Sequence, residues 1–403
     1  MIVEGRPSSR AFIRFHPRGV GSIVQARLRM FVLRKPGKLF VHRTNGRVWS
    51  ERKLTFRNAP KPGPLAGFPE ATGTGWLEFD VTGLVRLNQP VTIALTRSST
   101  QKLAIASRES GGRAPRLVIE SEQRSAPVIA AAGDIACERA NPRFNKGLGT
   151  ERHCHMQATY EVLRSLEPDA ILGLGDNIND MAPHDEFLGA FDPSWGKLKP
   201  LIRPIPGDAE YQVPGAAGYF QYFGSAAGDP AKGYYSFNVG SWHVVALNSN
   251  CRKIDGCGPR SPQAEWLRAD LAASQARCTL AYTHNPRVSS ASGGDFAQID
   301  ALWRVLADNG VELLLSGHHH NYERFAPLNA DLALDEQRGV QQFVVGTGGH
   351  STGVPGSPRQ MSVVRNGDTF GVLRLSLRAD GFDWRFIPEV GRSFSDRGSA
   401  SCH

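Results

Sequence analysis

The stretch LLLSGHHHNYER, residues 313–324, runs from three leucines through a Ser-Gly turn into three consecutive histidines. A short apolar run that ends at a Gly turn is typical of a buried strand, so the histidines are expected at the carboxyl end of that strand. In isolation, the three histidines fit a crowded polar turn as well as a metal site. The other strand ends of the chain decide between these two interpretations.

Four further apolar runs also end in a polar motif. They are AAGDIA with Asp134, GLGDNIND with Asp176 and Asn177, PIPGDAEY with Asp208, and AYTHNPR with His284. A single Gly-Asp after a strand is often a turn or a helix cap, and a lone His such as His243 is usually a packed strand residue. Five such endings in succession indicate one shared site, because the carboxyl ends of strands in open α/β sheets meet in one crevice.

Carboxylates and imidazoles together suit a pair of transition-metal ions, and one aspartate can bridge two ions about 3.5–4 Å apart. Such a pair activates a water as hydroxide and holds the oxygens of an in-line displacement at phosphorus. Phosphate ester hydrolysis is therefore the reaction that this set of residues predicts. Asp and His ligands accept iron, manganese or zinc as divalent or trivalent ions, so the sequence does not choose the metal.

The pattern of apolar residues divides the chain into two parts. From Phe12 to Glu120, short alternating runs between Pro-Gly turns predict an antiparallel β-sandwich. From Pro127 onward, buried apolar runs alternate with helical stretches, which predicts an α/β domain with a layered sheet. We therefore expect an all-β domain over residues 1–122, the polar link ESEQRSA, and an α/β domain over residues 127–403.

Charge is spread unevenly over these two parts. The whole chain has a formal net charge of +9, residues 1–122 hold 21 Lys plus Arg against 8 Asp plus Glu (net +13), and the remainder holds 26 against 30 (net −4). The basic part could favour an anionic polymer or a membrane surface, but its charges are scattered singly, which favours a solvated surface. Without aromatic-basic patches a nuclease is disfavoured, and no apolar stretch is long enough to span a bilayer.

The six cysteines contain no C-x-x-C pair, which argues against a zinc knuckle and a thioredoxin-like motif. Disulfides in an exported enzyme are favoured over reduced thiols, with Cys137 and Cys154 as the first expected bridge. The start MIVEGRPSSRAFIRF lacks the apolar core of a signal peptide and reads like the interior of a strand-rich domain without its first strands. A secreted location is therefore expected from the cysteines and not from the N-terminus.

The N-terminal part resembles the secreted carbohydrate-binding β-sandwich modules of the DNRLRE type. The words ARLRMFV, LTFRNAP, WLEFDVTGLV and IASRESGGRAPRLVI carry this resemblance over most of residues 10–120, without the family's opening strands. The resemblance implies binding of a polysaccharide or a cell wall. A purely structural appendage is the alternative.

Residues 127–403 resemble the calcineurin-like metallophosphoesterases, on the side of the purple acid phosphatases and particularly their secreted bacterial acid-phosphatase-like members. The family motifs Gly-Asp-x-Gly, Gly-Asp-x-x-Tyr, Gly-Asn-His-Glu, His-x-Pro and Gly-His-x-His are followed here in order. The words SFNVGSWHVVALNSNC, SPQAEWL, GHHHNYERFAP and VVGTGGH extend the match. This resemblance implies an αββα sandwich with a dinuclear metal centre.

Carried over residue by residue, the resemblance also implies the ligands. The first metal would be held by Asp134, Asp176 and His320, and the second by the bridging Asp176 with Asp208, His284 and His318. Candidates for a catalytic role are Asp176, Asp208, His284 and His319. Candidates for weak ligands or for residues that orient the ligands are Asn177, Asn179, Asn321, Tyr322 and Arg324, with a purely structural role as the alternative for the last two.

Several positions depart from the family motifs. Asn179 stands where the family has a metal-binding tyrosine, and Ala136 stands where some relatives carry a second His, so the first metal keeps only three firm ligands. Asp208 replaces the motif Asn and can still ligate. Ala209 replaces a His that lies near the departing oxygen, and the loss of such an acid costs about 10²- to 10⁴-fold for a poor leaving group.

The three histidines therefore have different expected roles. His318 and His320 each face a different ion, whereas His319, in a slot where relatives often have Asp, is expected to contact solvent or a neighbouring carbonyl. An alternative is that His319, or His350 of GTGGH, partly replaces the acid that is missing at Ala209.

The sequence thus predicts a metal-dependent phosphoesterase that is impaired for poor leaving groups. The alternative is a weak or inactive pseudophosphatase that binds a cell-surface polysaccharide or another polymer through its basic sandwich. Metal content separates the two, because about two transition ions per chain are needed by the enzyme and none by the binding protein.

The residue at position 179 predicts the colour of the iron-loaded protein. An asparagine gives no tyrosinate charge-transfer band, so we expect the protein loaded with ferric iron to lack the purple colour of its relatives. A visible absorption spectrum recorded during iron loading measures this. An intense tyrosinate band would contradict the assignment of Asn179 to the tyrosine position.

Overall fold

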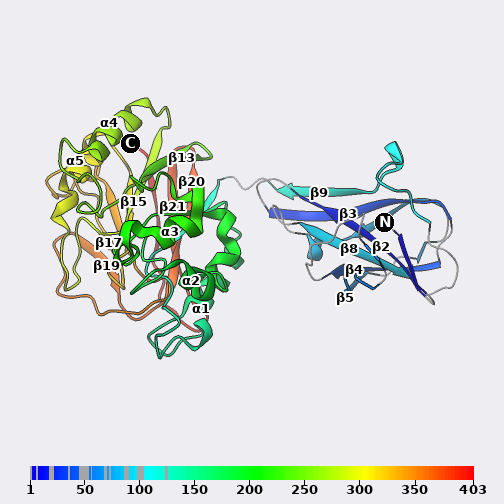
Figure 1. Cartoon of the computed structure of the whole chain (residues 1–403). Coiled ribbons are helices and arrows are strands. Elements are labelled where there is room, and N and C mark those ends of the chain that lie inside the picture. The colour runs from blue at the N-terminus through cyan, green and yellow to red at the C-terminus, as the bar shows by residue number, and fades with distance from the viewer. Residues whose placement is uncertain are drawn as a thin grey trace. The chain divides into compact units, whose positions relative to one another are not determined.

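The computed structural model describes residues 2–5, 8–17, 22–34, 37–44, 54–55, 57–67, 70–71, 74–85, 90–97, 104–122 and 126–403. The chain separates into two compact units, Met1–Ser125 and Ala126–His403, and Figure 1 shows the first as mainly strands and the second as a mixture of helices and strands. Residues 123–125 of the expected polar link lie outside the described residues. Among the described residues, none of the helices is long and apolar enough to cross a membrane.

The N-terminal unit is a sandwich of two antiparallel sheets, which confirms the predicted all-β domain. One sheet has the order β1(Ile2–Gly5), β2(Ser8–Phe15), β8(Val91–Arg97), β4(Gly37–Thr44), β5(Pro62–Gly67), with β6(Glu70–Ala71) beside β4. The other has the order β7(Gly75–Asp80), β3(Ser22–Val32), β9(Arg116–Glu122). Alternate residues of β3, such as Leu28 and Met30, are fully buried against Ile93 and Leu95 of β8, so the two-residue period of the sequence marks the core face.

The C-terminal unit contains two mixed sheets, of six and seven strands. The first has the order β12(Ile202–Pro204), β11(Ala170–Gly173), β10(Val128–Ala132), β20(Gly371–Arg378), β21(Gly381–Pro388), β22(Arg397–Ser401). The second has the order β13(Tyr235–Val239), β14(Trp242–Ala246), β15(Cys278–Thr283), β16(Leu313–Ser316), β18(Gln341–Val345), β17(Tyr322–Phe325), β19(Ser362–Asn366). Strands β10, β11 and β12 are parallel, as are β14, β15, β16 and β18, so their carboxyl ends point one way within each sheet.

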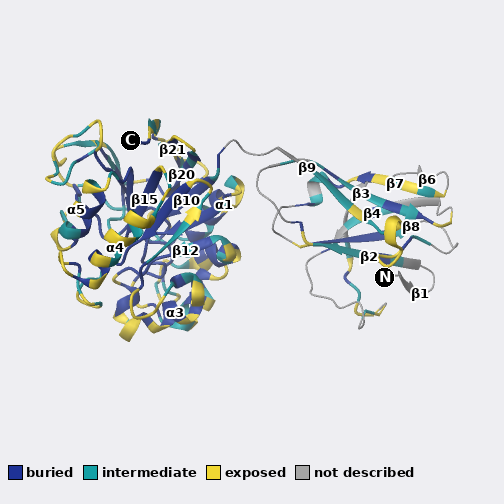
Figure 2. Ribbon diagram, turned by 90° about the horizontal axis from the view of Figure 1, so that it is seen from above, coloured by how far each residue is buried: buried dark blue, intermediate teal, exposed yellow. Residues whose placement is uncertain are grey.

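Helices cover the outer faces of these sheets. They are α1(Met156–Leu166), α2(His184–Glu186), α3(Ala217–Phe223), α4(Pro262–Ala273) and α5(Asp300–Asp308). Segments of 3-10 or π-helix in this unit are η3(Asn145–Gly147), η4(Phe187–Phe191), η5(Trp195–Leu201), η6(Glu210–Gln212), η7(Pro214–Ala216), η8(Gly224–Ala227) and η9(Ala297–Ile299), and the N-terminal unit has η1(Thr82–Leu84) and η2(Gly111–Arg113). Leu314 of β16 packs with the apolar face of α5, whereas its neighbours Leu313 and Leu315 join the core that includes β10 and β20. The second sheet is therefore covered by helices on one face and by the first sheet on the other, which confirms the predicted αββα sandwich; Figure 2 shows β10, β15 and β20 buried inside the unit.

All six cysteines are paired. The bridges are Cys137–Cys154, Cys251–Cys257 and Cys278–Cys402, with sequence separations of 17, 6 and 124 residues. The expected Cys137–Cys154 bridge is confirmed. Cys278 begins β15 and Cys402 follows β22, so the third bridge ties the end of the chain to a central strand of the second sheet.

Loop length predicts how much each bridge stabilises the C-terminal unit. In the chain-entropy model, a cross-link that closes about 125 residues is worth about 5 kcal/mol, and one that closes about 7 residues is worth about 2 kcal/mol. We therefore expect Cys278→Ala/Cys402→Ala to lower the free energy of unfolding more than Cys251→Ala/Cys257→Ala does. Urea unfolding followed by circular dichroism measures both, and an equal or larger loss for the short bridge would contradict the expectation.

Candidate metal centre

The predicted site residues lie in the loops that follow parallel strands of both sheets. Asp134 follows β10, Asp176 follows β11, Asp208 follows β12, His284 follows β15, and His318 and His320 follow β16. The structure brings these side chains together, although up to 186 positions separate them (320 minus 134). Ligand sites in α/β proteins are expected at this place, beyond the carboxyl ends of the parallel strands.

Three of these side chains converge most closely. Oδ1 of Asp208 lies 2.9 Å from Nε2 of His284 and 3.0 Å from Nδ1 of His318, and the two histidine nitrogens are 3.2 Å apart. Nδ1 of His284 donates to the carbonyl of Leu174 at 2.9 Å, so Nε2 is the nitrogen that can bind a cation once it has released its proton. The side chain of Asp208 is 54% exposed, which opens this position to solvent.

A second group surrounds the buried Asp134. Ligand atoms of Asp134, Asp176 and His284 all lie within 4.8 Å of one another. Oδ2 of Asp134 accepts the backbone N–H of His318 at 2.8 Å, and Oδ1 lies 3.2 Å from Nε2 of His320. Although Nε2 of His320 lies near, this buried Oδ1 has no hydrogen bond of good geometry in the part of the chain that the structure describes, as expected for an oxygen that faces a cation.

The carboxylates and histidines of the two groups shift each other's pKa values. Burial raises the pKa of Asp208, but hydrogen bonds from His284 and His318 outweigh burial and hold that pKa below its usual range. Burial also acts to lower the pKa of His284, yet the carboxylates of Asp176 and Asp208 raise it well above the ordinary value. Cations can replace the protons that bind this cluster of carboxylates and imidazoles, so the donor set fits a pair of transition ions.

The backbone around the site is strained or crowded. Asp134, Asp176 and His318 have φ values of 57°, 45° and 69°, in the left-handed region that L-residues with a side chain seldom adopt. A Cβ on Gly207 would lie 2.0 Å from Oδ1 of Asp176, so only glycine fits there. The packed sheets hold these loops in conformations that they would not adopt alone.

Glu210 is the functional residue that the sequence analysis missed. Its carboxylate is fully buried and accepts the backbone N–H groups of Asp176 at 3.0 Å, Asn177 at 2.8 Å, Ile178 at 3.2 Å and Gly207 at 2.6 Å. It thereby joins the loop after β11 to the loop after β12. Burial raises the pKa of Glu210 to about 7. The signal was present in the sequence, because the motif Gly-Asn-His-Glu ends in this residue.

The predicted accessory residues divide into two groups. Nδ2 of Asn177 donates to the carbonyl of Ile205 at 3.1 Å, and the backbone N–H of Asn179 donates to the carbonyl of Ala136 at 2.8 Å. Side-chain atoms of Asn177, Asn179 and Asn321 are buried without a hydrogen-bond partner among the described residues. Such orphaned amides beside the ligand loops leave polar atoms free for water or an ion.

Tyr322 and Arg324 contact Asp396 instead of the ligands. The Tyr322 hydroxyl donates to Asp396 at 2.7 Å and Nε of Arg324 donates to the same carboxylate at 2.6 Å. For both residues, these contacts fit a purely structural role, which was the alternative to orienting the metal ligands. Nε2 of His319 lies 3.2 Å from the carbonyl of Gly294, which is the kind of loop contact expected for this residue.

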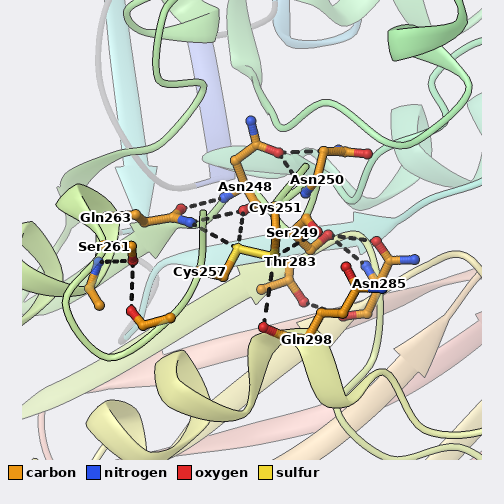
Figure 3. The surroundings of a disulfide bond; sticks show 12 residues. Asn248, Ser249, Asn250, Cys251, Cys257, Ser261, Gln263, Thr283, Asn285 and Gln298 are labelled. Carbon is orange, nitrogen blue, oxygen red and sulfur yellow. Dashed lines mark hydrogen bonds between the residues drawn. A yellow bond between two sulfur atoms is a disulfide. The ribbon is translucent and has the colours of Figure 1, made fainter. Parts of the chain in front are cut away.

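Figure 3 shows the network of amide side chains around the Cys251–Cys257 disulfide, which lies in the loop after β14. Nδ2 of Asn250 donates to the carbonyl of Pro206 at 3.2 Å, and the hydroxyl of Ser249 donates to Oδ1 of Asn285 at 2.8 Å. Pro206 precedes the Asp208 loop and Asn285 follows His284. The network therefore ties together the two loops that bring Asp208 against His284.

Comparisons with known proteins agree with the two units. Residues 1–121 match the model of carbohydrate-binding module family 96, and residues 128–322 match that of the calcineurin-like phosphoesterases. An uncharacterized protein of Mycobacterium tuberculosis is 28% identical over 324 residues, covering 67% of this chain and 57% of its own length. Purple acid phosphatase 22 of Arabidopsis thaliana is 30% identical over 154 residues, covering 36% of this chain and 34% of its own. The chain thus spans less than two thirds of these relatives.

Among solved structures, a purple acid phosphatase from yellow lupin seeds has a TM-score of 0.57 at 14% identity, covering 96% of this chain and 74% of that chain. At this identity the likeness concerns the fold alone. It supports the αββα architecture of the second unit.

Loss of the Glu210 carboxylate should weaken metal binding. We expect Glu210→Ala to lower metal affinity by about 10- to 100-fold, because residues behind the ligands typically contribute that much. Glu210→Gln keeps one acceptor oxygen and should lose less. Calorimetric titration of the metal-free protein with manganese measures both variants, and unchanged binding by Glu210→Ala would show that the two loops do not need this link.

Proposed function

We propose that this chain, whose residues 128–322 match the model of the calcineurin-like phosphoesterases, hydrolyses phosphate esters. The centre would be formed by Asp134, Asp176, Asp208, His284, His318 and His320. The observation that carries the proposal is the convergence of Asp208, His284 and His318, whose ligand atoms lie within 3.2 Å of one another. When bound, a pair of transition ions supplies Lewis acidity and a nucleophile at neutral pH.

These residues would form two sets of ligands, one for each metal ion. Asp134, Asp176 and His320 would hold the first ion, and Asp208, His284 and His318 would hold the second, with Asp176 shared. The first position is the more enclosed, since Asp134 is fully buried while Asp208 is half exposed. A phosphate ester would therefore approach from the side of Asp208 and His318.

With Ala209, the site lacks a side chain that could protonate the leaving group. The backbone N–H of Ala209 donates to Oδ1 of Asp176 at 3.0 Å and its side chain is 2% exposed, so the residue positions a ligand but offers no proton. His319 is turned toward the carbonyl of Gly294, which argues against its use as a replacement acid. We infer an enzyme that works best on esters whose oxygen leaves without protonation.

The N-terminal unit supports a second candidate function, the binding of a polysaccharide by a weak or inactive phosphatase. Trp76 is 39% exposed, packs edge-on against Phe31 at 5.5 Å, and lies 5.2 Å from the guanidinium of Arg29. An exposed indole of this kind can stack on a sugar ring. Three disulfides favour an extracellular location for either function.

Rates across leaving groups test the missing acid. We expect metal-dependent turnover of aryl phosphate esters with a steep dependence on leaving-group pKa, measured with manganese, zinc or iron. Ala209→His should flatten that dependence and raise the rate for poor leaving groups by up to about 10²- to 10⁴-fold, because a general acid contributes that much.

Ala209→Asn is the matched control, since it adds a polar side chain of intermediate size without an acid. A flattened dependence in this variant too would mean that the size of the side chain matters and not its proton. Absence of metal-dependent turnover on every ester, with no bound metal, would favour the polysaccharide-binding protein instead.

A further inference from the structure

A line of polar side chains leads away from His320 on the side opposite the ligands. Nδ1 of His320 is hydrogen-bonded to the hydroxyl of Ser351. The same hydroxyl lies 3.3 Å from Nδ1 of His350, and Nε2 of His350 lies 3.8 Å from Oδ2 of Asp180. The rings of His320 and His350 are 5.1 Å apart and 75° from parallel.

The hydrogens along this line have one arrangement that suits a metal ligand. Nε2 of His320 faces Asp134, so this nitrogen must carry a lone pair to ligate and Nδ1 must carry the hydrogen. The Ser351 oxygen then accepts from His320, and its own hydrogen is directed to Nδ1 of His350. That leaves the hydrogen of a neutral His350 on Nε2, on the side of Asp180.

Backbone hydrogen bonds to the site itself hold Ser351 in this position. The N–H of His350 donates to the carbonyl of Asp134 at 2.8 Å, and the N–H of Gly353 donates to the carbonyl of His320 at 2.7 Å. On the other side, the N–H of Cys154, which is in the Cys137–Cys154 bridge, donates to the carbonyl of His350 at 2.8 Å. Backbone bonds to Asp134 and His320 therefore hold the segment around Ser351, and the Ser351 hydroxyl lies against His320.

We propose that Ser351 is a positioning residue of the first metal position, and that its hydroxyl, which faces Nδ1 of His350, fixes His320 with Nε2 toward Asp134. This inference rests on the proposed function. The first position has Asn179 and Ala136 where relatives have stronger ligands, so it depends on Asp134, Asp176 and His320. If one of these three ligands loses its orientation, metal affinity should fall more at the first position than at the second.

Manganese binding to the full-length, metal-free protein tests the proposal without an assay of activity. We expect calorimetry to resolve two binding steps and His320→Ala to abolish one of them. Ser351→Ala should weaken that same step by about 10- to 100-fold and leave the other unchanged, because outer partners of ligating histidines typically contribute that much. Ser351→Thr keeps the hydroxyl and should restore the affinity.

Ser236→Ala is the matched control, since the Ser236 hydroxyl also belongs to a histidine–carboxylate cluster, donating to Asp270 at 2.6 Å beside His243. It should change neither step. His350→Phe keeps a ring but removes the nitrogen acceptor, and it should weaken the His320-dependent step even if Ser351→Ala does not fold.

Two outcomes separate this proposal from the proposed function. If the wild-type protein binds both ions and Ser351→Ala or His350→Phe binds them equally well, Ser351 has no positioning role while the metal centre stands. If the wild-type protein binds no metal, the proposed function fails and this inference fails with it. A loss of both steps in Ser351→Ala, not restored by Ser351→Thr, would show a general structural role and would also overturn the proposal.

Discussion

The candidate centre depends on the hydrogen bonds that the buried carboxylate of Glu210 accepts from the backbone of two loops. This carboxylate accepts N–H groups from the loop that carries Asp176 and from the turn before Asp208, and it has no contact with solvent. A buried carboxylate is costly to desolvate unless every oxygen is well bonded. Four backbone donors meet this requirement, and in doing so they bring two ligand loops from neighbouring strands into one rigid unit.

The strained backbone of the candidate ligands depends on the apolar core. Asp134, Asp176 and His318 all have positive φ values, which cost free energy for residues with a side chain. Such conformations persist only where the surrounding packing overdetermines them. Here the strands before these residues are fully buried between the two sheets, so the apolar core stabilises the strained turns at its edge.

The two candidate metal positions differ in their surroundings. The position around Asp208 opens to solvent and has short contacts to two histidines, whereas the position around Asp134 is enclosed and has fewer strong donors. An open position suits contact with a substrate, and an enclosed one with few ligands depends on the precise orientation of each. The polar side chains behind His320 begin at this enclosed position, because Nδ1 of His320 is hydrogen-bonded to Ser351.

The sequence by itself determined the two-part organisation, the α/β class of the second part and the strand-end motifs, because apolar periodicity and turn residues are local signals. The αββα arrangement was implied by the family resemblance. The sequence also predicted the Cys137–Cys154 bridge between cysteines close in the chain. Only the tertiary structure decided that Glu210 links two loops, that Tyr322 and Arg324 turn to Asp396, that Cys402 reaches Cys278, and that Ser351 meets His320. These contacts join residues that are far apart in the chain or on different loops, and they depend on how two sheets pack against each other, which no local pattern encodes.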